Sequence, residues 1–179
     1  MTAHGGVELE LLAGDPAAAV EFGEEGCRLF EEAGERGMLS TAAGMLAQAL
    51  YTLDRLDAAE RRAIQATELG ASDDAMTQML SKQVRAKVLA RRGEHAEAER
   101  LAREAVAVGS EAEMPNSLGD AHSDLAEVLE LAGRCEEAAA EVAKALALYE
   151  RKGNVVMSER ARARMAGLQG TSAVGKTSE

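Results

Sequence analysis

The segment Gly170-Thr-Ser-Ala-Val-Gly-Lys-Thr177 has the residue types of a nucleotide phosphate site. It fits the pattern G-x-x-x-x-G-K-[ST], in which backbone N–H groups and the lysine surround phosphate oxygens. Such a loop works where a buried strand leads into it and the N-terminus of a following helix points at the phosphates. Here a helical pattern precedes the segment, and only Ser178 and Glu179 follow it. Nucleotide binding is therefore the least favoured of three hypotheses for this chain, and we expect no cofactor.

Histidine and cysteine residues could supply metal ligands or nucleophiles. None of the three histidines, His4, His95 and His122, has the i, i+4 spacing that places two ligands on one helical face. Cys27 and Cys135 are far apart in the sequence and form no C-x-x-C motif. No serine or cysteine has a candidate base at a defined spacing. We predict that the protein is not an enzyme, that it binds no metal, and that both cysteines are reduced and buried.

The net charge and the hydropathy of the sequence limit the classes of molecule that this chain could bind. The formal net charge of −11 opposes binding to nucleic acid or to anionic lipid. No run of about 18 apolar residues could span a bilayer, and the first residues lack the basic and apolar regions of a signal peptide. We predict a cytoplasmic protein whose partner is a protein or a peptide, with no nucleic acid and no membrane.

The sequence contains an internal repeat. Gapless superposition aligns the segments Leu12–Ala19, Thr52–Ala59, Arg91–Ala98 and Leu131–Ala138. Their turn residues are spaced by 40, 39 and 40 positions and are Gly14, Asp54, Gly93 and Gly133. Glycine or aspartate at such a place suits the left-handed residue that closes a helix. Acidic residues follow the turn residues, and acidic side chains suit the positive N-terminal end of a second helix. Each segment therefore predicts a helix–turn–helix.

Small residues recur at matched places in the predicted second helices. They are Ala19, Ala59, Ala98 and Ala138 and, seven positions later, Gly26, Ala66, Ala105 and Ala145. Apolar residues follow them at helical spacing, as Val142 and Tyr149 do in the last pair. Aromatic residues make up only 2% of the chain, so its core must come from alanine, leucine and valine between closely packed helices. We find no pattern typical of a strand.

With these features the chain resembles the tetratricopeptide-repeat family over residues 7–168. Helix pairs of that family carry a small residue midway along the first helix, which Ala47, Ala86 and Ala126 match here. The resemblance implies an all-α fold, a right-handed superhelical stack of antiparallel helix pairs (an α-solenoid) closed by a capping helix at about 154–168. We expect residues 1–6 to be disordered and residues 169–179 to form a flexible tail. The period exceeds the usual 34 residues, so we expect longer helices, or longer links near 70–74 and 109–115.

Two segments extend the resemblance. Val84–Gly93 and Ala145–Asn154 are similar to the C-terminal repeat regions of large bacterial, actinobacterial-type signalling and regulatory proteins, such as cyclase-linked or ATPase-linked regulators. This likeness implies a noncatalytic scaffold or sensory domain that binds a polypeptide segment in bacterial signal transduction or transcriptional regulation.

The resemblance also implies that the first helices of the pairs line a concave groove. The candidate groove residues are Gln48, Tyr51, Gln83, Lys87, Arg91, Asp120, Ser123, Glu127 and Glu130. The third pair would present basic residues and the fourth pair acidic residues, which could orient a peptide of mixed charge. The alternative interpretation is that these charges pair across neighbouring helices or are simply solvated.

The N-terminal end offers a second candidate surface. Its apolar residues are Val7, Leu9, Leu11 and Leu12, on a short predicted helix with nothing before it to cover them. An upstream domain could pack there, or two copies could meet through it as a homodimer; alternatively, the end of the helix covers itself. Self-association is the second hypothesis for the function of this chain.

Overall fold

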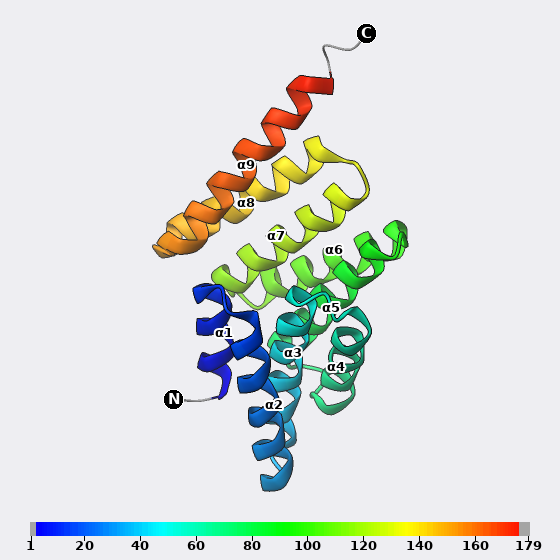
Figure 1. The fold of residues 1–179 in the computed structure, drawn as a ribbon, viewed down its shortest axis with the longest axis vertical. Helices are drawn as coiled ribbons and strands as arrows, with labels where there is room; N and C mark the ends of the chain where they lie inside the picture. The colour runs from blue at the N-terminus through cyan, green and yellow to red at the C-terminus, as the bar shows by residue number, and fades with distance from the viewer. Residues whose placement is uncertain (1–2, 176–179) are drawn as a thin grey trace. The chain divides into compact units, whose positions relative to one another are not determined.

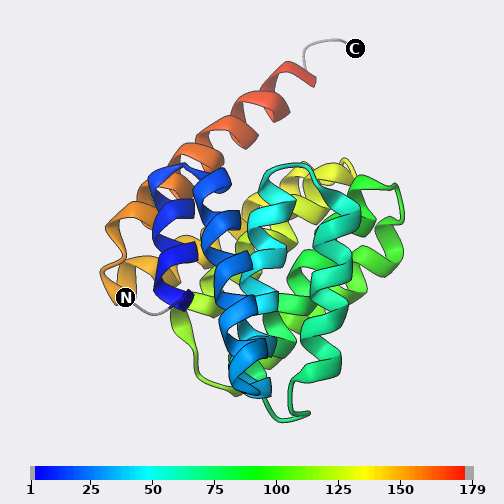
Figure 2. The same ribbon diagram turned by 60° about the horizontal axis from the view of Figure 1, so that its bottom comes forward.

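The computed structural model describes residues 3–175 of the chain, with side chains for residues 6–168. Within that range the fold is all-α, with nine helices and no strand (Figure 1; Figure 2 gives a second view). The helices are α1 (Ala3–Ala13), α2 (Pro16–Ala33), α3 (Arg36–Thr52), α4 (Leu56–Leu69), α5 (Ala75–Arg91), α6 (His95–Glu111), α7 (Pro115–Leu131), α8 (Cys135–Lys152) and α9 (Val155–Gly175).

The predicted turn residues join the helices into pairs. Gly14, Asp54, Gly93 and Gly133 lie between the two helices of α1/α2, α3/α4, α5/α6 and α7/α8, and their φ angles are 84°, 60°, 85° and 77°. All four angles fall in the left-handed region, which confirms the prediction. Asp54 is the only one of the four with a side chain, and aspartate tolerates this conformation better than most residues.

Side chains cap the starts of α2 and α9, whereas α3, α4, α6, α7 and α8 begin without a side-chain cap hydrogen bond. The side chain of Asp15 accepts a hydrogen bond of 3.0 Å from the backbone N–H of Ala18, and Pro16 opens α2. The side chain of Asn154 accepts from the backbone N–H of Met157 at 3.2 Å, just before α9 begins. A capping side chain satisfies one of the N–H groups that the first helical turn leaves unpaired.

The ends of the repeat region differ from expectation. Helix α1 begins at Ala3 rather than Val7, because its backbone packs closely on α2: a Cβ atom on Gly6 would lie 2.8 Å from the ring of Phe22. Helix α9 continues to Gly175 instead of ending near Leu168, since residues 169–175 contain no proline to stop it. The predicted flexible tail is therefore helical up to Gly175, and its last four residues lie outside the described range.

Both predicted ways of lengthening the repeat are present. Residues 70–74 form a link between α4 and α5. The link between α6 and α7 is shorter than expected and covers residues 112–114, because α6 continues to Glu111 and Pro115 already belongs to α7. Helices α5, α6 and α7 each contain 17 residues, so longer helices provide most of the extra length there.

The chain divides into two compact units, of which the first ends at Val88 and the second begins at Leu89. In the N-terminal unit α1 packs on α2, α2 on α3, and α3 on α4, the blue to cyan helices of Figure 1. Small residues set their spacing: a Cβ atom on Gly23 would lie 3.0 Å from the Cβ atom of Leu46. Ala19, Ala47 and Ala59 have no exposed surface.

In the C-terminal unit α6 packs on α7, α7 on α8, and α8 on α9. The matched small residues are buried here too: Ala98, Ala105, Ala126, Ala138 and Ala145 have no exposed surface. Tyr149 is the largest fully buried side chain among the described residues. The sequence prediction of closely packed helices with an alanine-rich core is therefore confirmed in both units.

Candidate binding surfaces

Four predicted groove residues lie on α3 and α5 in the N-terminal unit, and we name them the α3–α5 patch: Gln48, Tyr51, Gln83 and Lys87. The ammonium nitrogen Nζ of Lys87 lies 4.7 Å from the centroid of the Tyr51 ring. A cation at this distance from a ring is attracted by roughly 0.5–2 kcal/mol. Lys87 is 7% exposed and Tyr51 is 8% exposed, so the pair joins the two helices and shows only a small part of its surface.

Gln83 stands one helical turn before Lys87, on the same side of α5. Its side chain is only 2% exposed, and its amide nitrogen Nε2 donates no hydrogen bond to any described residue. An unpaired buried donor costs roughly 1–3 kcal/mol, and native proteins contain few of them. Gln83 is therefore a donor of this unit for which a bound molecule could provide the acceptor.

The other predicted groove residues belong to the C-terminal unit, where two of them are held by the last helix. Arg164 of α9 donates from Nε to Glu130 at 2.7 Å. It also donates to the backbone carbonyl of Ser123 at 2.8 Å and to the Ser123 hydroxyl at 3.2 Å. Ser123 and Glu130 of α7 therefore each have a partner on α9.

Asp120 has a structural partner as well. It accepts a hydrogen bond of 2.7 Å from the hydroxyl of Tyr149 on α8. Burial raises the pKa of Tyr149 well above its ordinary value, and the Asp120 carboxylate raises this pKa further. Of the remaining candidates, Glu127 is half-buried on α7 and Arg91 is exposed at the end of α5. The acidic side of the predicted groove is thus largely engaged within its own unit.

The N-terminal end is less open than expected. Val7 is 2% exposed and belongs to the core, because α1 lies against both α2 and α3. Leu11 packs against the same core, Leu12 is half-buried, and Leu9 is 53% exposed. The expectation that all four side chains lie uncovered is wrong for Val7. Self-association through this end remains a prediction, and Leu9 is its most exposed member.

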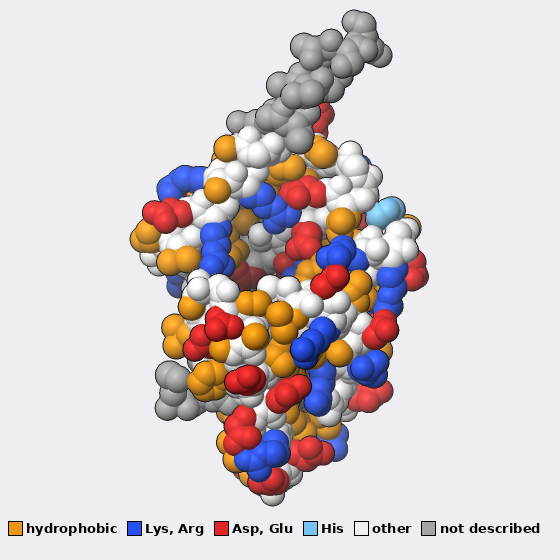
Figure 3. Space-filling view, in the orientation of Figure 1, with side chains coloured by type: hydrophobic (Ala, Val, Ile, Leu, Met, Phe, Trp, Pro, Cys, Tyr) orange, Lys and Arg blue, Asp and Glu red, His pale blue; other side chains and the backbone are white. Residues whose placement is uncertain are grey.

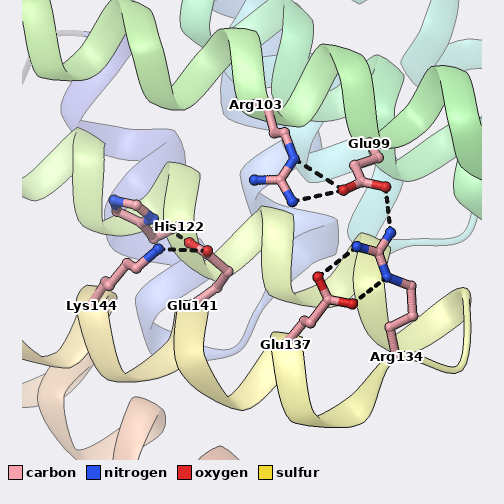
Figure 4. A network of polar contacts seen from close by, with 7 residues as sticks. All are labelled: Glu99, Arg103, His122, Arg134, Glu137, Glu141 and Lys144. Carbon is pink, nitrogen blue, oxygen red and sulfur yellow. Dashed lines mark hydrogen bonds and ion pairs between the residues drawn. The ribbon is translucent and has the colours of Figure 1, made fainter.

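A polar network in the C-terminal unit was not predicted from the sequence (Figure 4). Arg134, the residue that precedes α8, hydrogen-bonds Glu137 at 2.6 Å and also Glu99 of α6. Arg103 binds the other side of Glu99 at 2.7 Å. Hydrogen bonds from Arg134 lower the pKa of Glu99 and of Glu137. The i, i+3 spacing of Arg134 and Glu137 was a readable signal, whereas Glu99 is distant in the sequence.

A second group of polar contacts, also drawn in Figure 4, joins α7 to α8 through a buried carboxylate. Glu141 accepts from Lys144 at 2.7 Å, and its other oxygen lies 2.6 Å from Nδ1 of His122. Burial raises the pKa of Glu141, but the hydrogen bonds from Lys144 and His122 outweigh it and hold this pKa below its ordinary value. His122 thus has a structural role that its isolation in the sequence did not reveal.

Two surface hollows lie outside the predicted groove. The first, which we name the arginine hollow, has a volume of about 570 Å³ and is lined by α2, α3 and α4 of the N-terminal unit. The second has a volume of about 630 Å³ and lies in the C-terminal unit, lined by the α6–α7 link, α7 and the end of α8. One arginine directly before a helix and two more in the first half of that helix, in an acidic chain, could have indicated the first hollow from the sequence.

On the face drawn in Figure 3, acidic and basic side chains are intermingled, and no large area carries a single sign of charge. No three histidine, cysteine, aspartate or glutamate side chains in the described part of the chain are arranged to hold a metal ion. None of the described helices is long and apolar enough to cross a bilayer. Residues 170–175 continue the helix α9, and Lys176 and Thr177 of the glycine-rich motif lie outside the described residues.

Comparison with known proteins supports the repeat. The family described as Tetratricopeptide repeat matches residues 76–151. The chain has a tetratricopeptide-like repeat fold. A solved structure similar to it is that of a Podosopora anserina protein described as a kinesin light chain with nearly identical TPR-like repeats. Its TM-score is 0.56 at 15% sequence identity, over 95% of this chain and 94% of that one.

A further similar structure is BtubC (BKLC) from P. vanneervenii, with a TM-score of 0.56 and 14% identity over 93% of this chain and 78% of that one. At these identities the likeness shows the fold alone. No curated protein matches the sequence. Tetratricopeptide repeats in general are noncatalytic scaffolds for contacts between proteins, so the coarse function that the fold supports is protein binding.

Proposed function

We propose that this chain is a noncatalytic domain that binds a polypeptide segment, and that it serves as a scaffold or sensor in bacterial signalling or transcriptional regulation. The tetratricopeptide-like fold supports binding. The regulatory setting rests on the likeness of Val84–Gly93 and Ala145–Asn154 to regulator repeat regions.

The observation that carries the binding proposal is the unpaired amide of Gln83. A peptide backbone offers a carbonyl oxygen at every residue, which is the acceptor that this donor lacks. Lys87, one turn further along α5, would add a positive charge beside it, and the half-buried Gln48 of α3 a further amide. Because Gln83 and Lys87 are only 2% and 7% exposed, an extended segment would have to displace the side chains that cover them before it reached these groups.

The test is selection from a library of random peptides displayed on phage, followed by titration of the selected peptides into the purified chain. Gln83→Leu removes the unpaired donor and keeps a buried side chain of similar size. We expect this variant to be as stable as the parent or more stable, by about 1 kcal/mol, because a desolvated polar group has gone. We expect it to bind the selected peptides about tenfold more weakly.

Gln78→Leu is the matched control, since Gln78 is a half-buried glutamine on the same helix and outside the patch. It should leave peptide affinity unchanged. Equal affinity of the parent and Gln83→Leu would show that the α3–α5 patch is not the binding surface. A library that yields no peptide above the background of the bare support would contradict the proposed function itself.

A further inference from the structure

Arg55 and Arg134 occupy equivalent positions in two repeats, one residue after the turn residue of each. Their surroundings differ completely. Arg134 is held by two carboxylates, those of Glu99 and Glu137. Arg55 is exposed, and its guanidinium group makes no hydrogen bond or ion pair with any residue that the structure describes.

The repeat explains the difference. In the gapless superposition of the repeats, Glu137 corresponds to Ala58 and Glu99 corresponds to Val20. Both carboxylates that bind the arginine in the C-terminal unit therefore have apolar residues at the matched positions of the N-terminal unit. The N-terminal unit keeps this arginine and has no carboxylate at either of those two positions.

The arginine hollow opens at this place. Its lining includes Glu24 of α2, Leu50 of α3 and, from the start of α4, Arg55, Ala58, Arg61 and Arg62. Arg61, like Arg55, has no ion-pair partner among the described residues, and Arg62 donates only to the neutral Gln65, at 2.8 Å. Three guanidinium groups thus face a single carboxylate, in a chain whose formal net charge is −11.

Exposed arginines are often merely solvated, but arginines on the second helices of other pairs in this chain form ion pairs. Arg28 of α2 pairs with Glu25 and Glu32, and Arg100 of α6 pairs with Glu97. Arg55 also directly precedes α4, at the positive end of the helix dipole, and Asp57 is the acidic residue of the first turn there. A cation there is unfavourable by roughly 0.3–1 kcal/mol unless an anion compensates it.

We propose that the arginine hollow is a second binding site, which takes an acidic polypeptide segment whose carboxylates replace those of Glu99 and Glu137. A guanidinium group offers a planar fork of donors that fits a carboxylate in two parallel hydrogen bonds. Leu50 and Ala58 provide apolar contact for the carbon chain of a glutamate side chain. The site is lined by residues of α2, α3 and α4 and by Arg55, and it shares no lining residue with the α3–α5 patch, so the two sites can be tested separately.

The probe is a short fluorescent peptide, acetylated and amidated at its ends, in which glutamates alternate with alanine and leucine. A matched peptide carries glutamine in place of every glutamate. Fluorescence anisotropy at low salt should show saturable binding of the first peptide and none of the second. Arg55→Gln should weaken binding of the acidic peptide about fivefold, and Arg55→Gln with Arg61→Gln by more than about tenfold.

Ala58→Glu tests the proposal from within the chain. The new carboxylate stands three residues after Arg55, as Glu137 stands after Arg134, and should form the missing ion pair. We expect this variant to melt at the parent's temperature or slightly above it, and to lose binding of the acidic peptide. Arg28→Gln is the control, because it removes the same charge from an arginine of the same unit that already has carboxylate partners.

Three results would overturn the proposal. One is equal binding of the glutamate and glutamine peptides, and another is unchanged affinity in Arg55→Gln. The third is binding of inorganic phosphate at the hollow, seen as a shift of the arginine Nε–H signals in NMR spectra, without any response to the peptide. Weaker binding of the library-selected peptides by Gln83→Leu, together with unchanged binding of the acidic peptide by Arg55→Gln, would contradict this proposal alone. The proposed function would then still stand.

Discussion

The ring of Tyr149 lies against the backbone of Gly119, so closely that a Cβ atom on the glycine would come within 2.6 Å of the ring atom Cε1. Tyr149 is 1% exposed, and its hydroxyl reaches the carboxylate of Asp120, the residue after Gly119. The absence of a side chain at position 119 lets the helices α7 and α8 approach at this point. One glycine therefore positions the largest buried side chain of the C-terminal unit.

Gly119→Ala should destabilise the protein. The added methyl group must displace a ring with no free space around it, and overpacking of this kind costs roughly 1–3 kcal/mol. Urea denaturation measures the change. Gly167→Ala in α9 is the control, because nothing lies within 4 Å of its Cβ position, and alanine should gain up to about 1 kcal/mol there. Equal stability of the two variants would mean that the contact with Tyr149 is not tight.

Arg164→Ala should loosen the last helix. Arg164 of α9 hydrogen-bonds two residues of α7, Glu130 and Ser123. Its loss leaves a half-buried carboxylate and a backbone carbonyl without this donor, at about 1–2 kcal/mol. Hydrogen exchange of the α9 amides should become faster, while exchange in α6 stays the same.

Arg162→Ala provides the comparison for that experiment. Arg162 lies on the same helix and pairs with Glu150, but both side chains are about half exposed. Exposed ion pairs of this kind contribute little to stability. If both variants changed α9 exchange equally, the effect would come from lost charge or helix propensity and not from the contacts of Arg164.

The fold could be predicted because the features that define the repeat depend on residues close together in the sequence. Gly14, Gly93 and Gly133 mark turns that need a left-handed residue, and their spacing alone gives the helix pairs. Alanines at matched places, such as Ala98 and Ala138, lie where the helices approach most closely, and both have no exposed surface. Each of these features depends on one residue and its neighbours in the chain, so a single sequence carries it.

The binding surfaces were only partly predictable, because they depend on contacts between distant residues. The family resemblance placed Lys87 and Tyr51 in one predicted groove, and the structure brings their side chains together. It could not show that Arg164, from a helix predicted only as a cap, would hold Glu130. It also left Val7 uncovered, since the packing of α1 against α3 is not a pattern within either helix.

The two cysteines should differ in reactivity. Cys27 is buried, and burial raises the pKa of its thiol, so little thiolate forms near neutral pH. Cys135 is only partly buried, at the start of α8. With an excess of iodoacetamide, mass spectrometry should show labelling at Cys135 well before Cys27. Labelling of Cys27 at the same rate in the native protein, with Cys135→Ser as a check, would show that α2 opens readily.

The contact of Glu141 with His122 and Lys144 should make stability depend on pH. Because the pKa of Glu141 is lower in the folded protein than its ordinary 4.5, its contribution is fully present above 4.5 and is lost as the pH falls through the lowered pKa. Glu141→Gln should therefore lose about 1–2 kcal/mol of unfolding free energy at pH 7, since the carboxylate is only 8% exposed. The difference from the parent should shrink as the pH falls through this lowered pKa.

Glu137→Gln distinguishes burial from charge in that measurement. The pKa of Glu137 is also lowered, by its hydrogen bond to Arg134, but its side chain is 54% exposed and water can replace the lost contact. Its urea denaturation curve should therefore stay close to that of the parent at pH 7. A loss equal to that of Glu141→Gln would mean that net charge sets the stability of this unit. A loss confined to Glu141→Gln would mean that the buried contact between α7 and α8 sets the stability of this unit.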